Sequence, residues 1–248
     1  MAENLCRIGT VDVPARIDRE RYFAELDYLE LSALFSGPLK PSALAKWKDV
    51  ALAGSIGLVA PFVLTHRKAP DHPKPWPSDS TTGDYRDSAL SRTALEALVA
   101  DIDAVGAGCV IFRSADDFSP SAANRDQLAK FFGELAPAET LHADRVWVPG
   151  GLWGVRTAAK IATELGIILA VDPLVHDPAT PEERYEDLEA TSLYFRIENA
   201  GRTGLIRNEK LEDLAALLEH YEGLPTTVVF ASPERWQDAR NFKKMLKI

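Results

Sequence analysis

The sequence of 248 residues is poor in cysteine, has no excess of basic residues and contains no long apolar run. Its two cysteines, Cys6 and Cys109, each lie within a short apolar segment, which favours buried thiols in a reducing compartment over a disulfide framework. The formal net charge of -9 argues against general affinity for nucleic acid or for anionic membranes. Because no run reaches transmembrane length and the first residues lack an apolar signal region, we expect a cytoplasmic protein without a nucleic-acid or membrane partner.

Two motifs of familiar enzyme classes are also missing. No glycine-rich dinucleotide fingerprint follows the first predicted strand, because the chain reads Gly9-Thr10-Val11-Asp12 where that strand ends. The sequence has no His-Glu-x-x-His or similar metal-binding motif. These absences leave the cofactor unidentified and direct attention to the pattern of strands and helices.

Short apolar runs alternate with amphipathic segments along the whole chain. The pattern predicts strands at 5–10, 28–35, 56–64, 109–112, 145–148, 167–171, the start of 190–204, and 226–230. It predicts helices at 18–26, 41–53, 91–105, 121–135, 155–165, 181–188, 209–221 and from 232 onward. Eight strand–helix units in about 250 residues are typical of a (β/α)₈ barrel of the α/β class. We therefore expect residues 1–248 to form a single TIM-barrel domain, closed by parallel pairing of 226–230 with 5–10.

The segment 67–88 interrupts this alternation. It contains four prolines, one glycine and a lone Trp76, and it is too rich in proline to be a helix. Because it follows the third strand, we expect this loop at the C-terminal mouth of the barrel. Long loops of this kind are either ordered lids or mobile segments, and the sequence leaves both open.

Several different short motifs follow one another along the chain. They are Ile8-Gly9-Thr10, Leu29-Glu30-Leu31-Ser32-Ala33-Leu34-Phe35, Pro61 with Leu64-Thr65-His66, Tyr194-Phe195-Arg196, and Ala239-Arg240-Asn241. In order and spacing the chain resembles the YecE-like barrels of domain-of-unknown-function family 72. The resemblance spans nearly the whole chain and implies a barrel with a polar pocket but no agreed reaction.

The chain departs from the family pattern at many of its polar positions. The family's Ser-Gly-Trp after the first strand is absent. The replacements are Ser32 for Asn, Val59 for Lys, Arg113-Ser114-Ala115-Asp116 for Gln-Leu-Pro-Pro, Trp147 and Pro149 for Glu and Arg, and Glu198-Asn199 for His-Gly. These departures indicate a divergent member whose chemistry has changed or been lost.

Active sites of such barrels lie at the C-terminal ends of the strands. Reading those ends gives Asp12, Glu30, Ser32, His66, Arg113, Trp147, Asp172, Tyr194, Arg196 and Glu198. The stretch 190–204 is central, because period two brings Tyr194, Arg196 and Glu198 to one face. An inward arginine needs a partner, so we expect Arg196 to contact Glu30, Asp172 or Glu198.

The functional interpretation assigns a role to each group. Arg113 and Arg196 hold a carboxylate or phosphate, with Trp147 and Tyr194 as further substrate-binding residues. The catalytic candidates are Glu30, Asp172 and Glu198, one of them acting as acid or base with a shifted pKa. The opposing interpretation is a structural ring of ion pairs that only closes the barrel top.

Two other sites are weighed and disfavoured. Glu30, His66, Asp172 and Glu198, with His176 in reserve, are residue types that bind metals, but their spacing matches no metal motif, and we expect no metal. The loops 201–204 and 232–235 stand where barrels often bind phosphate, with Arg202 as a cation. Pro233 removes a donor there, and Glu234 repels an anion.

Together these features predict an enzyme that acts on a small polar or anionic metabolite, with hydrolase- or lyase-like chemistry as the expected reaction type. The alternative is a degenerate barrel that binds a ligand or a protein partner without turnover. Retained Glu30, Asp172, Tyr194 and Arg196 favour the first, and the replaced family residues favour the second.

Overall fold

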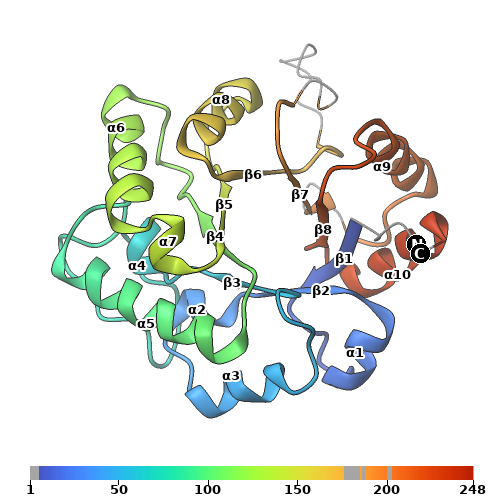
Figure 1. Cartoon of the computed structure of the whole chain (residues 1–248), viewed down its shortest axis with the longest axis horizontal. Coiled ribbons are helices and arrows are strands. Elements are labelled where there is room, and N and C mark those ends of the chain that lie inside the picture. The colour runs from blue at the N-terminus through green and yellow to red at the C-terminus, as the bar shows by residue number, and fades with distance from the viewer. Residues whose placement is uncertain (1–5, 176–184, 186–187, 200–202, 248) are drawn as a thin grey trace. The chain divides into compact units, whose positions relative to one another are not determined.

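The computed structural model describes residues 6–175, 185, 188–199 and 203–247. Eight strands follow one another in chain order around a closed parallel barrel, which confirms the predicted (β/α)₈ fold (Figure 1). The strands are β1 (Cys6–Val11), β2 (Tyr28–Leu31), β3 (Ile56–Val59), β4 (Cys109–Arg113), β5 (Asp144–Val148), β6 (Ile168–Val171), β7 (Leu193–Ile197) and β8 (Thr226–Phe230).

Helices separate most of these strands. They are α1 (Arg19–Glu25), α2 (Ala33–Ser36), α3 (Pro41–Lys48), α4 (Phe62–Thr65), α5 (Ala89–Val105), α6 (Ala122–Lys130), α7 (Ala138–Leu141), α8 (Val155–Leu165), α9 (Asn208–His220) and α10 (Arg235–Leu246). None of the helices in the described part of the chain combines the length and the apolar character that crossing a membrane requires.

The chain divides into two compact units, which are described separately. The terminal unit comprises residues 1–30 and 170–248, and the central unit comprises residues 31–169. In the terminal unit, β1 pairs in parallel with β8, from Cys6 opposite Thr226 to Thr10 opposite Phe230. The predicted closing pair of strands is therefore confirmed. Helix α10 packs against β1 and β8 (Figure 1).

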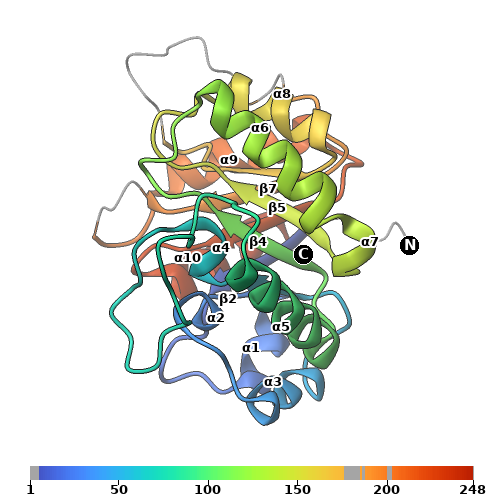
Figure 2. The same cartoon turned by 90° about the vertical axis from the view of Figure 1, so that its left-hand side faces the viewer.

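The central unit is organised around β3, β4 and β5 and an aromatic core. Phe112 of β4 makes edge-to-face contacts with Phe131 and Phe132, whose ring centres lie 5.5 and 5.2 Å away. Both belong to a π-helical turn, Phe131–Leu135, that continues α6. Helix α5 runs beside α3 in both views (Figures 1 and 2). A parallel strand that is buried on both faces needs apolar residues at successive positions, which accounts for the nearly continuous apolar runs in the sequence.

The helix boundaries predicted from Asp18, Gly106 and Gly166 are confirmed, whereas the boundary predicted from Ser232 is wrong. The side chains of Asp18, Ser88 and Ser121 accept hydrogen bonds from backbone N–H groups three residues later, at the starts of α1, α5 and α6. Gly106 and Gly166 end α5 and α8 in the left-handed conformation.

Several predicted boundaries are wrong where an apolar run contains more than one element. The strands expected at 28–35 and 56–64 end at Leu31 and Val59, and the remainder of each run forms α2 and α4. Periodicity does not separate a buried strand from a buried helical turn in such runs. The helix expected at 41–53 ends at Lys48, and the last helix begins at Arg235. The helix expected at 181–188 falls largely outside the described residues.

The last helix begins later because Ser232 does not cap it. The Ser232 hydroxyl instead donates to the Asp238 carboxylate at 2.6 Å, and Ile206 N–H donates to the same carboxylate at 3.0 Å. Asp238 is fully buried, and burial raises its pKa against the opposing effect of these two hydrogen bonds. It thereby ties the loop after β8 to the segment before α9.

The loop between α4 and α5 packs against other residues of the central unit. Trp76 donates its indole N–H to the carbonyl of Leu34 at 2.7 Å, and the buried Tyr85 hydroxyl lies 2.8 Å from Ser114 Oγ. Backbone N–H of Gly83 donates to Val63 O at 2.8 Å. These partners follow β2, β3 and β4, so the loop lies at the carboxyl ends of those strands, as expected from its position in the chain.

Gly83 lies close against the backbone that follows α4. Its φ is 84°, and a Cβ there would lie 2.4 Å from the carbonyl carbon of His66. Gly83→Ala should therefore cost about 3 kcal/mol of unfolding free energy in urea, combining left-handed strain with overpacking. Gly106→Ala is the matched control, because its φ is 70° but no atom lies within 4 Å of the added Cβ. Equal losses in the two variants would contradict the packed loop.

Candidate functional site

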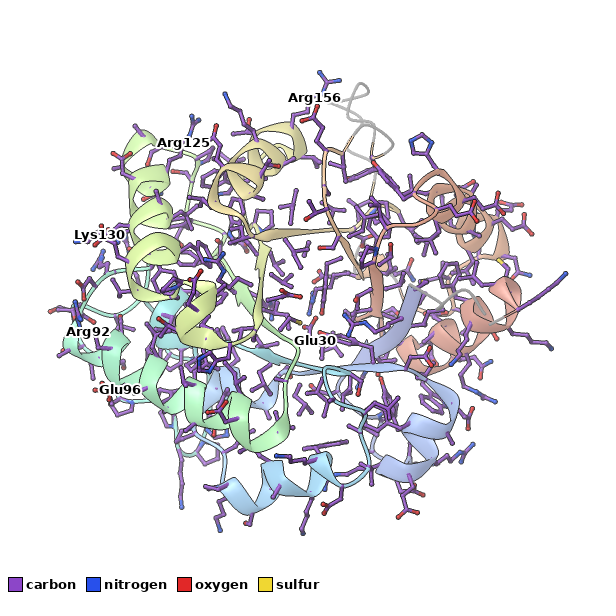
Figure 3. The ribbon with its side chains drawn as sticks, viewed as in Figure 1. Glu30, Arg92, Glu96, Arg125, Lys130 and Arg156 are labelled. Atoms are coloured by element: carbon purple, nitrogen blue, oxygen red, sulfur yellow. The ribbon has the colours of Figure 1, made fainter. Side chains whose placement is uncertain are left out.

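Glu30 is a fully buried carboxylate in the terminal unit. The Tyr194 hydroxyl donates to its Oε2 at 2.8 Å, and Arg196 Nε donates to its Oε1 at 3.1 Å. Figure 3 shows Glu30 among the strands, whereas Arg92, Arg125 and Arg156 of the central unit point outward from their helices. A buried carboxylate of this kind is tolerated only with charged or hydrogen-bonding partners, and Glu30 has both.

The alternation of two strands places these partners together. On β7, Tyr194 and Arg196 are two residues apart and share a face, as predicted. On β2, Tyr28 and Glu30 share a face in the same way, and the hydroxyls of Tyr28 and Tyr194 lie 3.3 Å apart. Tyr28 was not among the sequence candidates, although its spacing of two from Glu30 carried the signal.

Arg196 joins two carboxylates. Its Nε binds Glu30 and its Nη1 binds Glu198, so the predicted contact with a carboxylate is confirmed. Burial by itself lowers the Arg196 pKa, but the charges of Glu30 and Glu198 outweigh it and the pKa is raised. Arg196 is 6% exposed, and its Nη2 donates to no acceptor among the described residues. In the described part of the chain, two side-chain atoms are both buried and without a hydrogen-bond partner, and Arg196 Nη2 is not among them.

Asp172 lies beside this group without joining the ion pairs. Its two oxygens accept backbone N–H bonds from Glu198 at 2.8 Å and Leu174 at 3.0 Å. Burial raises the Asp172 pKa, and the charge of Glu198 adds to the effect. The two N–H bonds and the charge of Arg196 oppose it. Asp172 thus holds a proton more readily than an ordinary aspartate, while the Glu198 side chain is 52% exposed and reaches solvent.

Two further candidates, Trp147 and Arg113, belong to the central unit. Trp147 is fully buried and donates its indole N–H to Ser114 Oγ at 2.8 Å. Its ring packs edge-to-face on Trp153 at 5.0 Å. Arg113, at the end of β4, is partly exposed, and its guanidinium carbon lies 5.8 Å from the ring centre of Phe35.

The possible metal site and the phosphate-binding loops are the two sites that the sequence disfavours. Among the described residues, no group of three or more His, Cys, Asp or Glu side chains is placed to hold a metal ion. His176, Gly201 and Arg202 fall outside the described residues. At the loop after β8, the Ser232 hydroxyl is bound to Asp238. Asp12, another candidate from the sequence, follows β1 and has a φ of 52°. Its backbone N–H donates a hydrogen bond to the Glu30 carbonyl.

Comparison with known proteins identifies the fold. No family model matches the chain, and no curated protein matches it. A family 72 (DUF72) protein from Enterococcus faecalis V583 superposes with a TM-score of 0.72 at 13% identity, covering 98% of this chain and 96% of its own. A DUF72 protein from Thermotoga maritima MSB8 gives 0.62 at 14% identity, covering 97% and 100%. SacUVDE gives 0.60 at 12% identity, covering 98% of each chain.

These similarities confirm, at the level of the fold, the resemblance that the sequence motifs indicate. The low identities fit a divergent chain. They do not bear on which of the polar side chains act, so the roles of the candidate residues rest on the geometry above.

Replacing Arg196 tests the buried ion pair. Arg196→Met leaves the Glu30 carboxylate buried without its cation, which should cost about 3–5 kcal/mol of unfolding free energy. Adding Glu30→Gln to Arg196→Met should recover part of the loss, because the uncompensated charge is removed. Arg92→Met, on the exposed Asp87–Arg92 pair, should have no measurable effect. A double variant no more stable than Arg196→Met would contradict this account.

Asp172 makes a separate contribution that depends on pH. Because its pKa is raised in the folded protein, the folded state binds the proton more tightly than the unfolded chain. Stability from this group is therefore lost as pH rises from about 3.9, the ordinary aspartate value, through the folded pKa. The unfolding free energy of the wild type minus that of Asp172→Asn should fall across this window and stay level above it. A difference that rises with pH would show the opposite sign of shift.

Proposed function

We propose that this barrel binds a small anionic metabolite at the carboxyl ends of β6 and β7, with Arg196 as the anchoring group. The observation that carries the proposal is that the Arg196 guanidinium is bound through only some of its nitrogens. Glu30 and Glu198 hold its Nε and Nη1, which leaves Nη2 directed to neither carboxylate. A guanidinium fixed on one side and available on the other suits a carboxylate or phosphate.

The carboxylates beside Arg196 supply acid and base groups. Asp172, whose pKa is raised chiefly by burial, is the candidate proton donor, and the half-exposed Glu198 is the candidate base. Glu30 has no exposed surface and holds Arg196 and Tyr194 in place, so it acts as a positioning residue. Arg113 and Trp147 stay predictions for substrate binding. Trp147 offers a ligand no N–H, because Ser114 accepts it.

Ligand binding without turnover is the second candidate function. It is favoured by the burial of Trp147, because its packed indole occupies a position where the family resemblance implies a charge.

We further propose that residues 1–248 act as one domain in the cytoplasm. Neither Cys6 nor Cys109 is in a disulfide, which supports a reducing compartment.

A thermal-shift screen with small carboxylates and phosphate esters tests the anchoring role. A bound ligand stabilises the folded state by mass action, so a hit raises the melting temperature. Arg196→Lys keeps a cation beside Glu30 but loses the planar fork, and it should weaken a hit at least about tenfold. Arg92→Lys is the matched surface control and should bind as the wild type does. A hit that binds Arg196→Lys with wild-type affinity would overturn the proposal.

The same hit separates the two candidate functions. Incubation with the wild type followed by analysis of the ligand shows whether it is converted. Conversion that Asp172→Asn abolishes, with binding retained, supports acid–base chemistry at this residue. A ligand that binds through Arg196 and is recovered unchanged supports the binding barrel.

A further inference from the structure

The ion pair between Glu198 and Arg196 leaves one atom of each side chain without a hydrogen bond. Glu198 Oε1 binds Arg196 Nη1. The second carboxylate oxygen, Oε2, accepts no hydrogen bond from any residue that the structure describes, and Arg196 Nη2 donates none to those residues. Among the described residues, this ion pair therefore has an unused acceptor on one side chain and an unused donor on the other.

Solvent reaches both of these atoms. The Glu198 side chain is 52% exposed. Arg196 is mostly buried, but the buried side-chain atoms that lack a partner in the described part of the chain are Asp27 Oδ2 and Arg235 Nε, so Arg196 Nη2 retains some contact with solvent. A ligand that approaches from solvent can therefore meet the donor and the acceptor together.

The surrounding hydrogen bonds hold the pair in position before a ligand arrives. Arg196 Nε donates to Oε1 of the fully buried Glu30 at 3.1 Å, and the Tyr194 hydroxyl donates to Oε2 of the same carboxylate at 2.8 Å. The backbone N–H of Glu198 donates to Asp172 Oδ2 at 2.8 Å. A site whose groups are already ordered loses less conformational entropy when it binds a ligand.

The charges of this group favour a ligand that carries a positive charge as well as a negative one. Arg196 contributes one positive charge, whereas Glu30 and Glu198 contribute one negative charge each. The described groups whose charges raise the Arg196 pKa are Glu30, Glu198 and Tyr194, and none of them is a cation. Asp172 is neutral when protonated and adds a further negative charge when ionised. A ligand with only a negative charge is therefore repelled by the excess of carboxylates, and an ammonium on the same ligand offsets that repulsion.

We propose that the ligand of this site is a small amino acid, and that Glu198 determines this specificity. The inference rests on the proposed function, since Arg196 is again the group that binds the carboxylate of the ligand. Arg196 Nη2 donates to that carboxylate, and Glu198 Oε2 accepts a hydrogen bond from the ammonium. A carboxylate and an ammonium on the same or on neighbouring carbons match a donor and an acceptor on adjacent side chains.

Four three-carbon compounds test the specificity: alanine, β-alanine, propionate and propylamine. Isothermal titration calorimetry at equal pH and ionic strength gives the dissociation constant of each compound for the wild-type chain. Alanine or β-alanine should bind at least about tenfold more tightly than propionate and propylamine, because the amino acid makes a second charge-assisted hydrogen bond.

Variants of Glu198 test whether this residue is the source of the preference. Glu198→Gln should weaken amino-acid binding at least about tenfold, whereas propionate should bind as before or more tightly because a negative charge has been removed. Glu198→Asp keeps the carboxylate, and an amino acid should remain its tightest ligand of the four. Glu164→Gln, in the exposed Lys160–Glu164 pair, is the matched surface control and should bind all four compounds as the wild type does.

The outcomes separate this inference from the proposed function. If propionate binds as tightly as the amino acids and loses affinity in Arg196→Lys, the specificity is wrong and the anchoring role of Arg196 stands. If Arg196→Lys binds the amino acid with wild-type affinity, both are wrong. A preference for the amino acid that persists in Glu198→Gln, or a wild type that binds none of the four compounds, would overturn the specificity proposed for Glu198.

Discussion

The buried pairing of Glu30 with Arg196 is the interaction on which the candidate site depends. Removing either charge from water costs several kcal/mol, and only close mutual contact with additional hydrogen bonds offsets that cost. The structure supplies both, since Tyr194 donates to Glu30 and Glu198 shares Arg196. The pair therefore constrains β2 and β7 to present these side chains together, and every other polar group near it is positioned relative to a fixed guanidinium.

Burial gives the three acids around Arg196 different environments. Glu30 is enclosed and fully engaged, so its charge orients Arg196. Asp172 accepts two backbone N–H bonds, yet burial dominates and raises its pKa. Glu198 reaches solvent while keeping its contact with Arg196. These different environments are the basis of the proposed roles, with Glu30 as a support, Asp172 as a proton donor and Glu198 as an exposed base.

In the central unit, buried polar groups hold the long loop in place. Ser114 lies within hydrogen-bonding distance of both Tyr85 OH and Trp147 Nε1, and it joins the loop, β4 and β5 in a buried network. These polar groups therefore contact one another inside the protein. His66 Nε2, by contrast, has no hydrogen-bond partner among the described residues.

The sequence by itself determined the barrel, because the count and spacing of strand–helix units follow from hydrophobic periodicity and capping residues, and these are local. It also determined which face of β7 carries Tyr194 and Arg196, since side-chain alternation needs no tertiary information. Only the tertiary structure decided where apolar runs change from strand to helix, as after Leu31 and Val59. It alone decided that Trp147 is fully buried with its indole N–H on Ser114, and that Arg196 contacts Glu30 and Glu198 and not Asp172. Those outcomes depend on burial and on contacts between residues far apart in the chain, which a one-dimensional pattern does not encode.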